Sequence, residues 1–468
     1  MPDDVNYMTV NDMRRALDDD FTAVDLVEQS LQQIERRNDE VNAVIALRAE
    51  AALVEAKNAD SLPRAQRGPL HGVPLLIKDL NEIPDLPTTY GSRAFAGQTA
   101  DFEALVVTRL RAAGAIVVGK TNTPEFGLRP TTDNALFGST RNPFSLDHTS
   151  GGSSGGAAAA LATGMVPIAL GGDGGGSCRI PASCCGVVGM RPSRGLVPWA
   201  PIAYEYWGAL ATNGPMARTV ADARTMLEVM AGPVVGEPYG VSIAPRSASA
   251  GDRPWRIAVA VTPPHGIVDD AVLDVVRRAQ ATLSALGHEV EEIELDLTGL
   301  REPWEVVVEA STAMTAEHMV GDAGLSRLES NTLALALRGR QRSAADYAHA
   351  MHEMRNRSAL IMQGTEQYDA ILTPTLTQPA MPLEERLDTE SHEERWSRYL
   401  DWLAFTYPIN CTGQPAISLP GGLSQSGLPI GVQLIGRMGD DAGVLTIAQT
   451  FEDAQPWHDS YAQLGGQK

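Results

Sequence analysis

The sequence predicts a single α/β enzyme built on one large mixed, mainly parallel β-sheet that is sandwiched between α-helices. Strand-like and helical stretches alternate along most of the 468 residues, and such alternation is typical of a sheet covered by helices. Hydrophobic residues make up 43% of the chain, which is enough to bury a sizeable core. In addition, one lysine and one of two glycine- and serine-rich segments directly follow strand-like apolar sequence, which marks these segments as candidate catalytic positions.

The elements are expected in the following order. Apolar residues recur at three-to-four spacing from residue 10 to about residue 60, which predicts two helices packed outside the core. Further strands are expected at residues 73–77, 115–118, 165–170, 257–261, 289–295, 370–373, 417–419 and 431–434. Further helices are expected at residues 102–113, 157–163 and 271–286.

Charge and cysteine content narrow the classes of function and partner. The formal charge of −21 and the pI near 4.8 argue against nucleic-acid binding, which relies on basic patches. Four cysteines in so long a chain do not make a disulfide framework. The first residues lack the features of a secretory signal, and no apolar stretch is long enough to span a bilayer. We therefore expect a soluble cytoplasmic protein, a monomer or homodimer, that binds a small molecule and neither nucleic acid nor a membrane.

The three chemistry-bearing positions are Lys78, Ser153 and Ser177. A serine hydroxyl is a weak nucleophile and needs a nearby base to take its proton. No histidine lies in the three segments, so the remaining candidate base is Lys78, which ends the apolar run at residues 73–77. Burial disfavours the ammonium form and lowers a lysine pKa. Lys78 could thus be neutral near pH 7, with one serine passing the proton between it and the other.

Several motifs in the same order carry a resemblance to a known family. They are Gly72-Val-Pro-Leu-Leu-Ile-Lys78-Asp79, Asn134-Ala-Leu-Phe-Gly138, Gly151-Gly-Ser-Ser-Gly-Gly156, Asp173-Gly-Gly-Gly-Ser-Cys-Arg179 and Gly214-Pro-Met-Ala-Arg218. From about residue 10 to residue 455 the chain resembles the amidase signature family. The resemblance implies that Lys78 is the base, Ser153 a relay serine held by a cis peptide bond, and Ser177 the nucleophile. It implies the family's fold, with a helical region at residues 1–65 and one compact core at residues 66–468.

Two departures from the family's usual pattern surround the nucleophile. Gly174 stands where the family commonly has threonine, and Cys178 stands where a β-branched residue is usual. Neither change removes a catalytic atom, although the first could loosen the loop. The resemblance also makes the Pro-, Gly- and Ser-rich stretch at residues 232–254 a loop and not a domain boundary, because later strands would complete the same sheet.

The glycine-rich approach to Ser177 suits the binding of a developing oxyanion. Successive backbone N–H groups can converge on the charge, and Gly174, Gly175, Gly176 and Ser177 are the expected donors. Three further residues are expected around them. Arg179 would pair with a buried carboxylate such as Asp173, and Ser154 would either hydrogen-bond the lysine or simply begin a helix. No metal and no cofactor are expected.

Four other interpretations fit the sequence less well. Gly151 to Gly155 also match the G-x-S-x-G elbow of α/β-hydrolases, but residues 141–149 do not predict the strand that this elbow requires. The second glycine-rich loop lacks the Gly-Lys-Ser/Thr of a phosphate-binding loop. Cys178 is expected to point away from Ser177 and to pack. His349 and His352 could bind a metal on one helix face, but an exposed polar face explains them better.

The substrate is less sharply predicted. Trp199, Tyr204, Tyr206 and Trp207 could line an acyl or aryl pocket or belong to the core, and so could Trp402, Phe405 and Tyr407. The main alternative function is that of the glutaminase A-type subunit of an aminoacyl-tRNA amidotransferase, which needs charged partners for glutamine. Leu403 and the loop at residues 126–130 replace the polar residues expected for that subunit. We therefore expect a stand-alone amidase for neutral aryl or alkyl amides, with carbamates or esters as side substrates.

Overall fold

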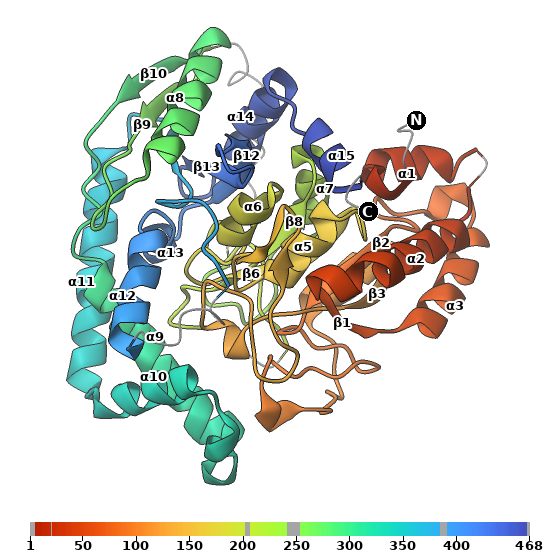
Figure 1. Ribbon diagram of the computed structural model, residues 1–468, viewed down its shortest axis with the longest axis horizontal. Helices are drawn as coiled ribbons and strands as arrows, with labels where there is room; N and C mark the ends of the chain where they lie inside the picture. The colour runs from red at the N-terminus through yellow and green to blue at the C-terminus, as the bar shows by residue number, and fades with distance from the viewer. Residues whose placement is uncertain (1–4, 20, 202–205, 241–252, 384–390, 466–468) are drawn as a thin grey trace.

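The computed structural model describes residues 5–19, 21–201, 206–240, 253–383 and 391–465, and in this part of the chain an 11-stranded sheet has helices on both faces (Figure 1). The strands are β1 (Val44–Leu47), β2 (Pro74–Lys78), β3 (Ile116–Thr121), β4 (Arg141–Asn142), β5 (Ser145–Thr149), β6 (Ile168–Asp173), β7 (Val188–Arg191), β8 (Thr212–Ala217), β9 (Arg256–Val259), β10 (Glu289–Glu292), β11 (Ala370–Pro374), β12 (Ala416–Leu423) and β13 (Pro429–Gly436). The helices are α1 (Val10–Ala16), α2 (Ala23–Val41), α3 (Ala49–Asp60), α4 (Leu105–Ala112), α5 (Gly155–Ala162), α6 (Arg179–Cys185), α7 (Val220–Met230), α8 (Asp270–Ala285), α9 (Arg301–Thr315), α10 (Ser330–Gln341), α11 (Ala344–Gly364), α12 (His392–Trp402), α13 (Tyr407–Thr412), α14 (Asp441–Ala454) and α15 (Asp459–Gly465).

The large sheet is mixed, with the order β1-β3-β2-β6-β8-β7-β12-β13-β11-β9-β10. Strands β3, β2 and β6 are parallel neighbours, and so are β11, β9 and β10. The pairs between β6 and β11 are antiparallel, as is the pair of β1 with β3. The predicted mixed α/β sheet is confirmed. Its antiparallel share is larger than the helix–strand alternation indicated, because middle strands such as β12 and β13 follow each other through a short turn and not through a helix.

The N-terminal region holds more elements than the two helices predicted for residues 10–60. Helix α2 begins with a capping box between Thr22 and Asp25 and ends at Asn42, whose φ of 51° stops the helix. The chain then forms β1, which pairs with β3 at the sheet edge, before α3 begins. The prediction was wrong here because the four residues of β1 are too few to give a strand periodicity. The predicted division of the chain at residue 65 stays a prediction.

Two central strands were not predicted. Strand β8 contains Asn213, Gly214 and Pro215, three residue types that are depleted in strands. All six of its residues are nevertheless buried between β6 and β7. Burial on both faces therefore outweighs the local preference of the backbone. Strand β7, with four buried residues, was missed for a related reason: it is short and contains Gly189.

The prediction that residues 141–149 form no strand was also wrong. They form β4 and β5, an antiparallel two-stranded ribbon that is separate from the large sheet. Pro143 lies in the connection between the two strands, where a missing backbone N–H disturbs no ladder. The ribbon leads directly into the first glycine-serine segment.

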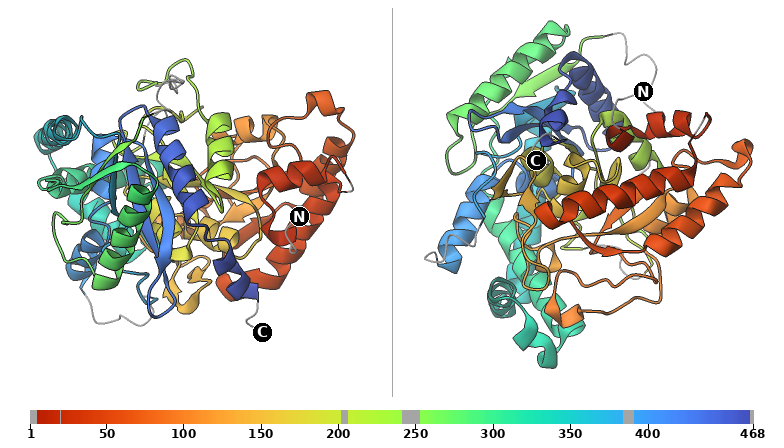
Figure 2. Two further views of the ribbon diagram at one scale, coloured as in Figure 1. Left: turned by 90° about the horizontal axis from the view of Figure 1, so that it is seen from above. Right: turned by 45° about the vertical axis from the view of Figure 1, so that its right-hand side comes forward.

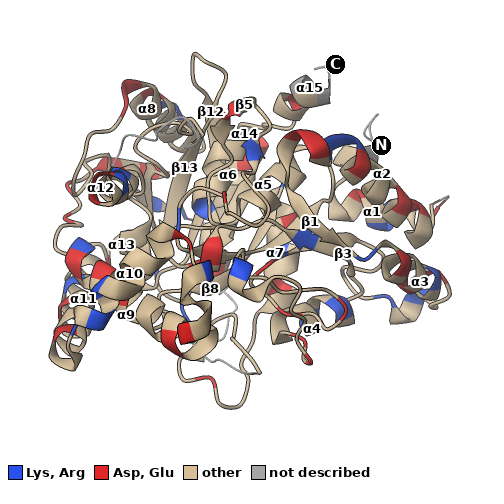
Figure 3. Ribbon diagram, turned by 60° about the horizontal axis from the view of Figure 1, so that its bottom comes forward, with Lys and Arg blue, Asp and Glu red and all other residues tan. Residues whose placement is uncertain are grey.

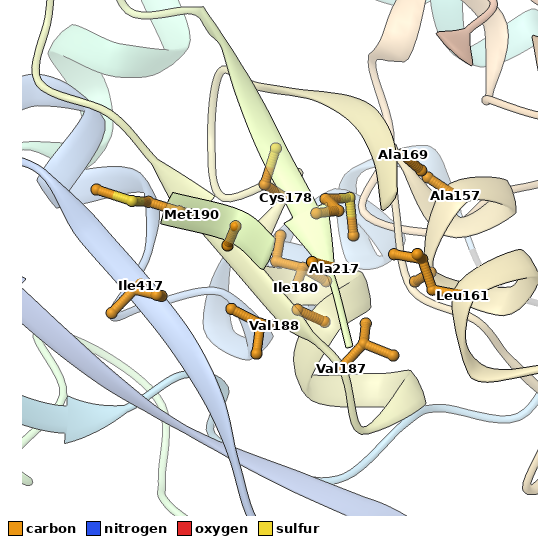
Figure 4. Close-up of a cluster of buried hydrophobic side chains, with 14 of the residues drawn as sticks. Ala157, Leu161, Ala169, Cys178, Ile180, Val187, Val188, Met190, Ala217 and Ile417 are labelled. Carbon is orange, nitrogen blue, oxygen red and sulfur yellow. The ribbon is translucent and has the colours of Figure 1, made fainter. Parts of the chain in front are cut away.

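The core beneath the site is packed between α5, α6 and the middle of the sheet. Every residue of α5 is buried, as expected for a helix that is apolar on all sides. Figure 4 shows the side chains that gather there: Ala157 and Leu161 of α5, Ala169 of β6, Ile180 of α6, Val188 and Met190 of β7, Ala217 of β8 and Ile417 of β12. This packing fixes the two loops that precede α5 and α6.

The outer helices lie at the two ends of the sheet. Helices α2 and α3 accompany the β1 edge, and α8 to α11 accompany the other end (Figures 1 and 2). Lys, Arg, Asp and Glu occur on these outer helices and also on other helices and loops (Figure 3). Within the part of the chain that the structure describes, none of the helices combines the length and apolarity needed to cross a bilayer.

Candidate active site

Lys78 is the last residue of β2 and lies inside the protein. All five residues of β2 are buried, and β3 and β6 flank the strand in parallel. The carboxyl ends of these strands therefore meet at one edge, where ligands bind in open α/β sheets. Lys78 Nζ donates to Ser153 Oγ at 2.7 Å, to Ser154 Oγ at 2.9 Å and to Gly172 O at 3.3 Å. Its side chain thus links both glycine-rich segments.

The electrostatic surroundings of Lys78 favour the neutral amine. Burial lowers the pKa of Lys78 from 10.5 to about 8, although the Asp173 carboxylate acts in the opposite direction. Lys120 on neighbouring β3 is also buried, but it forms an ion pair with Asp79 at 3.3 Å. Among the described residues, no such ion pair is found for Lys78. The two buried lysines therefore differ in their partners: Lys120 is bound by a carboxylate, whereas Lys78 is bound by two serine hydroxyl groups.

Ser153 and Ser154 lie in the loop between β5 and α5. The Gly152–Ser153 peptide bond is cis, as the family resemblance implied. A side chain at Gly152 would come within 2.5 Å of the Thr131 carbonyl oxygen, so only glycine fits there. Ser154 was expected either to hydrogen-bond the lysine or simply to begin a helix, and the structure has the hydrogen bond with Lys78. Ser154 is also the N-cap residue of α5, but its side chain makes no capping hydrogen bond.

Ser177 lies at the end of the second loop, between β6 and α6. Hydrogen bonds to the backbone carbonyl groups hold this loop in place. The carbonyl oxygens of Gly174, Gly175 and Ser177 accept from Trp304 Nε1, Thr406 Oγ1 and Ser154 N, respectively. These three hydrogen bonds use the carbonyl oxygens of the loop and involve none of its N–H groups. Ser177 is 8% exposed, whereas Ser153 and Lys78 are 2% and 1% exposed. Ser177 is thus the most accessible of the three.

One of the four predicted oxyanion donors is already engaged. The Gly176 N–H donates to Asp173 Oδ1 at 3.0 Å, so it does not face an oxyanion, and its inclusion among the donors was wrong. Among the described residues, no hydrogen bond is found for the N–H groups of Gly174, Gly175 and Ser177. The carboxylate of Asp173 also accepts from the Cys178 N–H, and it therefore shapes the loop from both sides of Ser177.

Asp173 and Arg179 form the ion pair expected from the sequence. Arg179 Nη2 lies 2.8 Å from Asp173 Oδ1, and both side chains are fully buried. Asn410 Nδ2 donates to the same carboxylate, and Gln433 accepts from Arg179. The Arg179 guanidinium holds the pKa of Asp173 well below its usual range, against the effect of burial.

Replacing Asp173 with asparagine is expected to lower the free energy of unfolding by about 3–5 kcal/mol, because it leaves buried guanidinium groups without a counter-charge. The pair Asp274 and Arg277 is exposed, so Asp274→Asn should cost less than about 1 kcal/mol. Urea denaturation of both variants measures the difference. An equal decrease in the free energy of unfolding of both variants would show that the buried ion pair stabilises the fold no more than the exposed one.

Aromatic side chains line the cavity that contains Lys78, Ser153 and Ser177. It measures about 100 Å³ and is lined by Tyr90, Phe126, Trp199, Tyr206 and Trp207, among others. Tyr204, which was considered with them, lies outside the described residues. Trp402, Phe405 and Tyr407 are buried in the core instead. The first aromatic group is thus placed to contact a substrate, and the second is not.

A smaller cavity of about 30 Å³ lies on another side of Ser177. Leu403 and the loop at residues 126–130 contribute to its lining. Arg129 in this loop forms ion pairs with Asp133 and Glu329, so its charge is compensated within the protein. Trp304 and Trp396 stack at this cavity with ring centroids 6.1 Å apart. The space next to Ser177 is accordingly apolar.

The family of the protein follows from its similarity to known proteins. The model of the Amidase family matches residues 25–445. The chain belongs to the amidase signature family. It is 36% identical over 452 residues to the acylamidase of Rhodococcus erythropolis, across 93% of this chain and 92% of that protein.

Two solved structures extend the comparison. One is 6-aminohexanoate cyclic dimer hydrolase in complex with its substrate, with a TM-score of 0.90, 31% identity and coverage of 97% of this chain and 98% of that chain. The other is a bacterial aryl acylamidase, with a TM-score of 0.89, 28% identity and coverage of 99% of both chains. The protein is therefore an amidase, a hydrolase that acts on amide C–N bonds.

The rival interpretations fit this amidase less well. A short strand, β5, does precede the first glycine-serine loop, but it belongs to the separate ribbon, whereas the hydrolase elbow rises from the central sheet. Cys178 is fully buried near Gly214, and burial raises the pKa of its thiol well above the usual range. It is the N-cap residue of α6 and does not lie in an extended segment. His349 and His352 are exposed, and the described residues contain no cluster able to hold a metal ion.

Three residues that hold the amidase loops were not found from the sequence. Thr406 and Trp304 anchor the carbonyls before Ser177, and Asn410 binds both the Asp173 carboxylate and the Asp173 carbonyl. All three lie far along the chain from the loop they support. Thr406 and Asn410 follow Leu403, the position compared above with the amidotransferase subunit, at distances of three and seven residues. For Trp304 the sequence offers no comparable signal.

Proposed function

We propose that this amidase hydrolyses neutral aryl or alkyl amides through an acyl-enzyme on Ser177, with Lys78 as the base and Ser153 as the proton relay. The observation that carries the proposal is the 2.7 Å contact between a buried, unpaired lysine amine and Ser153 Oγ, in a cavity that also reaches Ser177. A hydroxyl nucleophile requires a base of this kind, and a base with a pKa near the working pH is the most effective.

In the first half of the reaction, Ser177 Oγ attacks the carbonyl carbon of the amide. Its proton passes to Ser153, which gives its own proton to the neutral Lys78 amine. The C–N bond then breaks, and the proton held by Lys78 returns through Ser153 to the departing nitrogen. The products of this half are a free amine and an ester between the acyl group and Ser177.

In the second half, water takes the place of the amine. Ser153 and Lys78 remove a proton from the water as it attacks the ester, and the same proton is returned to Ser177 Oγ when the acid leaves. In both halves a negative charge develops on the carbonyl oxygen. Backbone N–H groups of Gly174, Gly175 and Ser177 are the proposed donors to that charge, each worth roughly 3–4 kcal/mol when well placed.

The lining of the two cavities supports the choice of substrate class. Aromatic side chains surround the reactive groups on one side, and Leu403, Trp304 and Trp396 do so on another. Apolar and aryl groups on either side of the amide would be stabilised there by burial. Carbamates and esters are proposed as side substrates, because the same acyl transfer from oxygen or nitrogen applies to them.

The alternative function, a glutaminase subunit of an aminoacyl-tRNA amidotransferase, lacks support at the positions that would bind glutamine. Leu403 is buried and apolar, and Arg129 is held by two carboxylates. A free amino acid needs a partner for each of its two charges, and a buried charge without a partner is costly.

One assay separates these functions. We expect the purified single chain to hydrolyse acetyl and benzoyl para-nitroanilides, and to release ammonia from glutamine at least about a hundredfold more slowly, since leaving two unpaired charges in an apolar site costs several kcal/mol. Initial rates of both reactions with one enzyme preparation give the comparison. Glutamine turnover equal to anilide turnover would favour the amidotransferase alternative.

A further inference from the structure

The cavity around Ser177 adjoins a larger cavity of about 600 Å³. Tyr90, Trp199, Tyr206 and Trp207 line both, so the two spaces meet at these side chains. The larger cavity is bounded on another side by Met314 of α9 and Met319 of the helical turn that follows α9. A group attached to the substrate can therefore extend from the scissile amide into this space.

Aromatic side chains form part of the wall of the larger cavity. Tyr90, Phe102, Trp199, Tyr206 and Trp207 contribute to it, and the Trp199 and Tyr206 rings meet edge to face with centroids 4.7 Å apart. Aromatic faces bind apolar groups, but they also attract cations through the negative charge of the ring face. The rings alone therefore admit two kinds of occupant.

Glu82 distinguishes between these occupants. Among the described residues that line the larger cavity, it is the only one with a charged side chain. Tyr90 donates its hydroxyl to Glu82 Oε1 at 2.7 Å, which holds the carboxylate at the wall. Within the described part of the chain, no partner is found for Glu82 Oε2. An apolar tail in this cavity would cover a carboxylate without replacing its lost water contacts, and this is unfavourable.

Two asparagines add unsatisfied polar atoms to the same cavity. Asn81 and Asn213 are each 2% exposed, and both line the cavity. Asn213 Oδ1 and Asn81 Nδ2 have no hydrogen-bond partner among the described residues. Asn213 is paired across the sheet with Gly172, whose carbonyl accepts from Lys78. An acceptor without a partner among the described residues therefore lies beside the strand position that Lys78 contacts, and buried polar atoms of this kind normally have a partner.

We propose that the larger cavity is a subsite for a protonated amine at the far end of the amide substrate. Glu82 supplies the counter-charge, the aromatic rings surround the cation, and Asn213 Oδ1 accepts from an ammonium N–H. The net charge of −21 also favours the approach of cationic molecules. This inference rests on the proposed function and narrows it. The groups next to the scissile bond remain apolar, and the amine lies beyond them.

The test uses two matched series of para-nitroanilides and the purified full-length chain. In the first series, ω-aminoacyl anilides of increasing length are compared with acyl anilides in which a methyl group replaces the ammonium. In the second, the aniline ring carries either an aminomethyl group, which is protonated, or an ethyl group of similar shape. We expect kcat/KM to be about tenfold higher for the amine than for its methyl counterpart in one series, the size typical of a desolvated cation next to a carboxylate and rings.

Variants of Glu82 test the assignment directly. Glu82→Gln keeps the shape of the side chain and an acceptor for Tyr90, and should remove most of the tenfold preference. Glu82→Lys should reverse it, in favour of anilides that carry a carboxylate at the same place. Asp85→Asn is the matched control, since Asp85 lies three residues further along the loop, pairs with Arg48 and lines neither cavity. It should leave the preference unchanged.

The outcomes separate this inference from the proposed function. Hydrolysis of the methyl compounds with no preference for the amine in either series would overturn the subsite and leave the proposed function intact. A preference that Glu82→Gln and Asp85→Asn reduce equally would also overturn it, because the effect would then come from net charge. No hydrolysis of any anilide by the unaltered chain would overturn the proposed function and the subsite with it.

Discussion

Replacing Ser177 with alanine is expected to abolish amide hydrolysis, with a loss in kcat of roughly 10⁵–10⁶-fold, the size found when the nucleophile of a serine hydrolase is removed. The substitution deletes the atom that would attack the carbonyl and leaves the loop bonded through its backbone to Trp304, Thr406 and Ser154. Initial rates with a chromogenic anilide, together with a thermal melt to show that the variant is folded, measure the loss.

The matched control is Cys178→Ala, which changes the adjacent residue. Cys178 is buried and packs near Gly214, so most of the activity should remain. Retention of activity in Ser177→Ala combined with its loss in Cys178→Ala would identify the thiol as the nucleophile and contradict the proposed mechanism.

The second large effect concerns Lys78 and pH. The proposed base must be neutral, and the pKa of Lys78 is lowered by burial to about 8. Below that pH the neutral fraction rises tenfold for each pH unit, so log kcat/KM should increase with a slope of one and level off above about pH 8. The sign is fixed, because protonation of the amine removes the base. A pH profile of kcat/KM from initial rates measures it.

Lys78→Met keeps most of the side-chain volume and removes the amine. The variant should lose several orders of magnitude in kcat/KM, and what remains should not follow the same pH curve. Lys57→Met makes the same substitution at an exposed helix position. It should change neither kcat/KM nor its dependence on pH. If Lys78→Met retained the pH profile of the unaltered chain, the lysine would be structural and another group would act as the base.

The three proposed catalytic residues could be named from the sequence because each lies next to a strong local pattern. Lys78 ends an apolar strand, and Ser153 precedes the alanine-rich helix α5. The motifs also occur in one order along the chain, which is why the family could be named.

The supporting contacts could not be predicted, because they join distant parts of the chain. Thr406 and Asn410 lie more than two hundred residues from the loop that they hold. The engagement of the Gly176 N–H by Asp173 depends on the exact path of three glycines, a path that their wide conformational freedom leaves open. Strand β8 was missed because its Asn, Gly and Pro residues disfavour strands, and burial decides the outcome there.

The most direct test of the central claim is to find which atom carries the acyl group. Ser177 is the most exposed of the three proposed catalytic residues, and it lies in the cavity with Lys78 and Ser153. After treatment of the full chain with a serine-directed fluorophosphonate, intact-mass spectra should show one adduct. Peptide mapping should place it on Ser177, and Ser177→Ala should take up none. An adduct on Ser153 or Cys178, with Ser177 unmodified, would contradict the account.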